Sequence, residues 1–183
     1  MRHLWNGNKS GQASALMVMT PIIPGCEDGL RADLEKLHNA GSPLARSTRT
    51  HFARWVIVPN FVSDPEQPRR DDLNCQYLVF TSNFDGPLGS YLDELCRQLA
   101  PEAPRIWGRC IGCPEPAAGA ALAAYLLHNK INTGFFVAAY PDATVAEVTR
   151  SLGTRAQMIE FAVRAQTMDS VELQRAFIEE FKI

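Results

Sequence analysis

Two polar side chains stand among bulky apolar residues in the stretch THFARWVIVPNF, and they are the first candidates for chemistry. His51 offers a group that can transfer protons near neutral pH, and Arg54 offers a fixed positive charge that could hold an anion. Trp55 would place an aromatic wall beside them. We take His51 and Arg54 as candidate catalytic residues and Trp55 as a candidate ligand-binding residue.

A structural role for both polar residues is the simpler interpretation, and we favour it. His51 would then end the strand and Arg54 would form a salt bridge, because buried polar groups are usually satisfied within the protein. Strict alternation along a strand places His51 and Trp55 on one face and Arg54 on the other. Sequence alone does not decide which of these faces the helices cover.

Asn83 and Trp107 complete the candidate site as ligand-binding residues. Asn83 lies in SNFDGPL, where a strand pattern gives way to a helix pattern, and turn chemistry explains this stretch equally well. If the strands of 50–58 and 76–83 pair as an antiparallel hairpin, His51 and Asn83 lie at the same end. Polar groups that converge on an apolar cavity are typical of small-ligand sites.

The motif CIGC has the spacing of a thiol redox pair or of half a zinc site. Prolines follow it, whereas a redox pair usually begins a helix, and the second pair that zinc needs is missing. We therefore interpret Cys110 and Cys113 as incidental thiols and expect no metal site. Phosphate-binding, dinucleotide-binding, serine-hydrolase and metalloprotease motifs are absent, so the sequence specifies no cofactor.

Composition indicates an ordinary globular protein. The chain has 183 residues, of which 46% are hydrophobic and 21% charged, and its net charge is −2. A nearly neutral balance indicates neither a nucleic-acid nor a membrane partner. The five cysteines form an odd set without a framework spacing, and no convincing signal peptide precedes them. Reduced thiols and a cytoplasmic location are the expectation.

The elements that would position these residues follow the order β-α-β-β-α-β over about residues 15–113. That order predicts an α+β, ferredoxin-like antiparallel sheet with two helices on one face. RIWGRCIG is its expected fourth strand. We expect residues 1–14 to form a flexible tail and residues 15–183 a single domain. Its C-terminal extension, residues 114–183, would add a strand near Thr133–Tyr140 and several helices.

The blocks HFARW, LVFTSNFDG and WGRC resemble those of an uncharacterised family of bacterial proteins over roughly residues 15–165. By fold that family is similar to dimeric α+β barrel proteins. The resemblance implies a homodimer in which the partner covers the open face of the sheet and leaves a chamber there. It implies no established activity, because one fold serves many functions.

Three classes of function follow from these observations. The first is a small-molecule-binding or cofactor-free oxygenase-like protein that uses a chamber on the open sheet face. The second is a haem- or redox-associated protein with His51 or another histidine as axial ligand. The third is a non-catalytic accessory or interaction module. A large apolar sheet face, with Trp55, Ile57, Tyr77 and Val79, predicts self-association through this face or through the C-terminal helices.

Overall fold

The computed structural model of the protein describes residues 8–45, 47–62, 66 and 72–181. The chain divides into two compact units, Met1–Val145 and Ala146–Ile183, and each is considered by itself. In the described parts of both units, no helix is long and apolar enough to cross a membrane.

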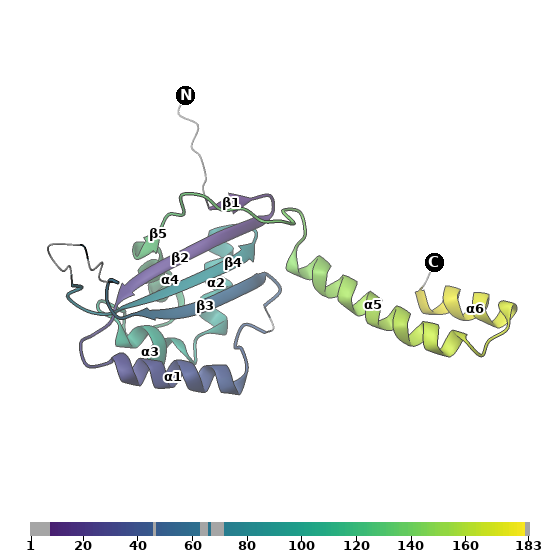
Figure 1. Ribbon diagram of the computed structural model, residues 1–183, viewed down its shortest axis with the longest axis horizontal. Helices are drawn as coiled ribbons and strands as arrows, with labels where there is room; N and C mark the ends of the chain where they lie inside the picture. Colours follow the sequence, from purple (N-terminus) through teal and green to yellow (C-terminus); the bar gives the residue numbers. More distant parts are fainter. Residues whose placement is uncertain (1–7, 46, 63–65, 67–71, 182–183) are drawn as a thin grey trace, which may run out of the picture. The chain divides into compact units, whose positions relative to one another are not determined.

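An open antiparallel sheet forms the centre of the first unit (Figure 1). Within the described residues its strands are β1 (Lys9–Ser10), β2 (Ala13–Pro21), β3 (Thr50–Val58), β4 (Tyr77–Asp85) and β5 (Lys130–Ile131). The order across the sheet is β1-β2-β4-β3, and β5 also pairs with β2. The predicted α+β class, the antiparallel sheet and the pairing of β3 with β4 are therefore confirmed.

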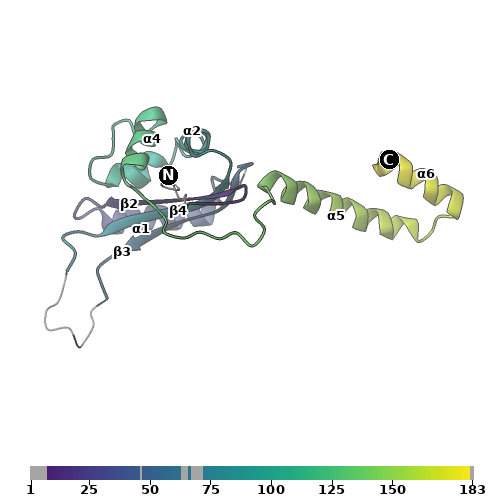
Figure 2. The same cartoon turned by 90° about the horizontal axis from the view of Figure 1, so that it is seen from above.

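Among the described residues of the first unit, four α-helices pack around this sheet. They are α1 (Glu27–Ala40), α2 (Leu88–Gln98), the short α3 (Ala103–Ile106) and α4 (Gly119–His128). Figure 2 shows α2 and α4 together on one side of the sheet, and in Figure 1 α1 runs beside β3. The buried residues of α2 recur at helical spacing, as expected of a helix with one apolar face.

Alternation along β2 and β4 separates the two faces of the sheet. Every second residue along these strands points toward the helices. The buried side chains on this face are Leu16, Val18, Thr20, Leu78, Phe80, Ser82 and Phe84. The other face, which we call the second face, is less covered. Phe52 and Val56 of β3 belong to it and are exposed.

The fourth strand predicted at RIWGRCIG is wrong. The chain forms α3 there, followed by a 3₁₀ turn at Trp107–Arg109, and only Cys110 makes an isolated antiparallel bridge, to Ile22. Ile106 and Trp107 are adjacent in sequence and both fully buried, which a half-buried strand does not allow. Pro104 in the first turn of α3 also favours a helix start.

The strand predicted at Thr133–Tyr140 is also wrong. Backbone N–H groups of this segment donate to side chains of the N-terminal hairpin instead of to a neighbouring strand. Thr133 N–H donates to Asn8 Oδ1 over 2.7 Å, and Ala138 N–H donates to Ser10 Oγ over 3.2 Å. The segment Thr133–Tyr140 therefore lies against the hairpin of β1 and β2. The first part of this hairpin falls in residues 1–14, which were expected to form a flexible tail. Residues 1–7 of that tail lie outside the described residues.

In its described part, the second unit is a pair of helices, α5 (Val145–Ala165), whose first residue still belongs to the first unit, and α6 (Ser170–Phe181). Phe161 is its one buried residue among those described, and its ring packs against those of Phe177 and Phe181 at 5.7 and 5.5 Å. Asp169 Oδ1 accepts the N–H groups of the first turn of α6, which fixes where this helix begins.

Gly11, in the turn between β1 and β2, permits the close approach of the segment that ends at Pro141. Its φ is +61°, and an added Cβ would lie 2.3 Å from the carbonyl oxygen of Pro141. We expect Gly11→Ala to lower the free energy of unfolding by about 1–3 kcal/mol, measured by urea denaturation. Gly25→Ala is the matched control, because Gly25 also has a positive φ but no atom near its Cβ position. Equal losses for the two variants would contradict the contact.

Candidate functional site

His51 meets a carboxylate through an irregularity in β3. The pairing with β4 slips by one residue between Thr50 and Phe52, so His51 is the extra residue of a β-bulge. Its Nε2 lies 2.7 Å from Oδ1 of Asp85, and both side chains are largely buried. The other oxygen of Asp85 accepts the backbone N–H of Val145, also over 2.7 Å. This arrangement joins β3, β4 and the end of the first unit.

The other predicted residues do not converge on His51. Arg54 and Asn83 are on the second face, because Arg54 pairs with Thr81, and Asn83 is two residues from Thr81 along β4. Trp107 is fully buried on the helix side, where its ring packs edge-on against Phe80 at 5.5 Å. A single site made of all five predicted residues is therefore not what the structure brings together.

Trp55 occupies a different position from that of Trp107. It packs on Phe80 at 4.9 Å and on Trp107 at 6.3 Å. It also lines two adjoining hollows, of about 340 and 440 Å³, between α1 and β3. Leu34 and His38 also line both hollows. The two hollows therefore form one open groove, which we call the Trp55 groove. Of the predicted site residues, Trp55 and Arg54 line this groove.

Polar residues of α1 on the other side of the Trp55 groove were not among the predicted site residues. His38 lines both hollows, and Arg31 and Glu35 line one of them, all one or two helical turns apart. Their signal in the sequence was a polar stripe on an amphipathic helix, which is also the pattern of any solvated helix face. Only the placement of α1 beside the edge strand β3 distinguishes the two cases.

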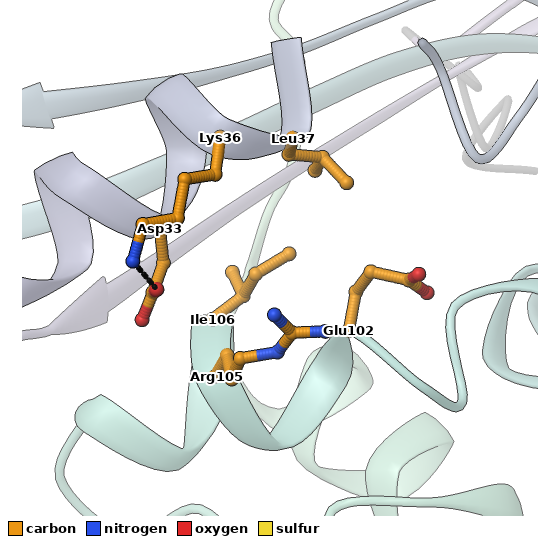
Figure 3. Close-up of a pocket in the computed structure, with 6 residues that line it drawn as sticks. All are labelled: Asp33, Lys36, Leu37, Glu102, Arg105 and Ile106. Atoms are coloured by element: carbon orange, nitrogen blue, oxygen red, sulfur yellow. Dashed lines mark ion pairs between the residues drawn. The ribbon is translucent and has the colours of Figure 1, made fainter. Parts of the chain in front are cut away.

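A separate small cavity of about 150 Å³ lies between α1 and α3 (Figure 3). In Figure 3, Asp33 and Lys36 of α1 form an ion pair at its edge, with Glu102 and Arg105 on the α3 side. Asp33 also accepts a hydrogen bond from Arg109 over 2.7 Å, and the Arg109 guanidinium lowers the pKa of its carboxyl. The side chains of Lys36 and Arg109 both pair with the Asp33 carboxylate. Asp33 therefore joins α1 to the segment after α3 and has a structural role.

The thiols of CIGC have the properties of core residues. Burial raises the pKa of Cys110 to about 11, although the Thr20 hydroxyl, which donates to its sulfur over 3.3 Å, lowers it in part. Burial also raises the pKa of Cys113. A redox-active cysteine needs the opposite shift, because the thiolate is the nucleophile. Across residues 8–45, 47–62, 66 and 72–181, no group of three or more ligating side chains is placed to hold a metal ion.

Comparison with protein-family models, with curated proteins and with solved structures gave no match to this chain.

Replacing His51 and Arg54 separately distinguishes structural from surface roles. We expect His51→Ala to lower the free energy of unfolding by about 1–2 kcal/mol, because Asp85 loses a hydrogen-bond partner in a largely buried position. Arg54 is exposed, and we expect Arg54→Ala to leave the melting temperature unchanged. Thermal and urea denaturation of the two variants provide the measurement. A stable His51→Ala protein would show that the pair with Asp85 contributes nothing to the fold.

Proposed function

We propose that the protein binds a small organic molecule in the Trp55 groove. The observation that carries this proposal is the position of Trp55, which is fixed by aromatic neighbours on one side and lines both hollows on the other. Its indole N–H is buried without a hydrogen-bond partner in the described part of the chain, as is that of Trp107, so a ligand would pack on the ring of Trp55 and not on its donor.

The lining of the groove favours a flat, largely apolar ligand. Its floor and walls are apolar and are formed by Leu34, Leu37, Pro43, Ala53, Trp55 and Ile57. His38 and Arg31 of α1 add hydrogen-bond donors at the rim, and Glu35 adds an acceptor. A mainly apolar hollow with a few polar groups is the usual construction of a small-molecule site. His38 would be the group available for proton transfer if the protein also acts on its ligand.

This proposal keeps the binding role expected from the sequence but gives it a different location. The chamber expected on the second face requires a partner subunit to enclose it, whereas the Trp55 groove belongs to one chain. The split β-α-β-β-α order and the β2-β4-β3 sequence of strands support the finer assignment of a ferredoxin-like fold, which we propose with it. Membership of the bacterial family with the HFARW and LVFTSNFDG blocks is a further part of the proposal.

Binding of 1-anilinonaphthalene-8-sulfonate tests the groove, because this dye combines an aromatic body with one negative charge. We expect saturable binding with a fluorescence increase, weakened about tenfold by His38→Glu and by Leu34→Glu, as each brings a negative charge to the groove. Arg105→Glu is the matched control, since Arg105 is exposed and lines the separate cavity between α1 and α3. Equal affinities for all four proteins would exclude the groove as the binding site.

A second candidate function, an interaction module that forms a homodimer, is favoured by α5. Val148, Leu152, Ile159 and Val163 are exposed and lie on one face of this helix, about opposite to Phe161. The spacing is symmetric about the point between residues 155 and 156. An antiparallel copy of α5 would therefore place Val148 against Val163 and Leu152 against Ile159, as a two-fold interface requires.

Light scattering across a concentration series tests this dimer. We expect wild-type protein to be dimeric and Leu152→Glu to shift the dissociation constant upward by at least about tenfold, because the contact would bury an unpaired charge. Ser151→Glu introduces the same charge on α5 outside the apolar stripe and should leave the dimer intact. A monomeric wild-type protein, or a dimer that resists Leu152→Glu, would contradict the α5 interface.

A further inference from the structure

We propose a second ligand site, for a small organic anion, between Lys9 and Lys130 of the first unit. It lies in a cavity of about 600 Å³, within the usual size range of small-molecule sites. This cavity shares no lining residue with the Trp55 groove. The inference is thus independent of the function proposed above.

The register of the sheet brings the two lysines to one side of the same strand. Lys9 pairs with Ser14, and Lys130 pairs with Val18, so both extend from the same edge of β2. Figure 1 shows β1 and β5 along this edge. Directly paired residues share a face, and Ser14 and Val18 are four residues apart, so both lysines lie on the helix side. Their backbone positions are about 13 Å apart along β2, a distance that the two long side chains can span.

The charges around the cavity all have one sign. Among the described residues, Lys9 and Lys130 are the charged ones that line it, and none of the described lining residues is a carboxylate. Lys130 donates to the neutral Asn132, a contact that does not compensate its positive charge. Two ammonium groups that face one cavity without a counter-charge create a positive potential there, and an anion is the ligand that lowers its energy.

Neutral groups of the lining also favour an anionic ligand. Gln12 and Ser14 offer hydrogen-bond donors to an oxyanion. Leu88, the first residue of α2, is also part of the lining, and the first turn of that helix contains no acidic residue. The positive end of the helix dipole therefore adds to the charge of the lysines. Phe84 supplies an apolar wall, which fits a carboxylate or a phosphate attached to an organic body.

Isothermal titration calorimetry of the full-length protein tests this site with two probes, phenyl phosphate and phenylacetate, at constant ionic strength. We expect at least one of them to bind in the millimolar range or more tightly, and the stronger probe identifies phosphate or carboxylate as the preferred group. Lys9→Gln and Lys130→Gln should each weaken binding about tenfold, and the double variant should abolish it. Lys130→Arg keeps the charge and should retain binding.

Lys36→Gln is the control, because Lys36 is an exposed lysine that lines another cavity. Its affinity for the probes should equal that of the wild type. Circular dichroism spectra confirm that each variant is folded, and Lys130→Arg separates loss of charge from disturbance of β5. Failure of both probes to bind wild-type protein overturns the proposal. Binding that survives in the Lys9→Gln, Lys130→Gln double variant also overturns it.

Discussion

The burial of Trp107 is the contact on which the rest of the first unit depends. Its ring is fully buried and lies against Phe80 of the sheet and Trp55 of the edge strand. Removing a side chain of this size from a core costs about 3–5 kcal/mol, a large fraction of the stability of a domain. This burial holds α3 and its following turn against the sheet, and α3 in turn packs against α1. The groove between α1 and β3 exists because these aromatic contacts fix its floor.

Trp55 connects this core to the surface. Phe80 and Trp107 hold one side of its ring, so the other side is presented to the groove in a fixed orientation. A rigid aromatic surface loses little conformational entropy when a ligand packs on it, which is why such residues recur in binding sites. His51 has a different role in the same strand, since its pair with Asp85 fixes the bulged end of β3. One strand thus combines a structural end and a centre that lines the Trp55 groove.

The pattern of apolar residues was sufficient to predict the principal strands, α2 and the antiparallel class of the sheet. It failed at RIWGRCIG, because adjacent buried residues and an early proline favour a short helix that only the tertiary packing of Trp107 stabilises. Strict alternation also failed at His51, because a β-bulge leaves no mark in the sequence. Trp55 and Arg54 were predicted site residues that do line one hollow. Their partners on α1 could not be predicted, because a polar helix face looks the same whether or not a strand edge lies beside it.

The indole N–H signals in a ¹H–¹⁵N spectrum test the central claim about Trp55 most directly. Trp55→Phe and Trp107→Phe variants assign these signals, and titration with 1-anilinonaphthalene-8-sulfonate then reports on each ring separately. The account predicts that the Trp55 signal moves progressively with dye concentration while the Trp107 signal stays in place, because Trp107 is sealed in the core. A Trp55 signal that does not move, or equal movement of both signals, would contradict a binding site in the groove.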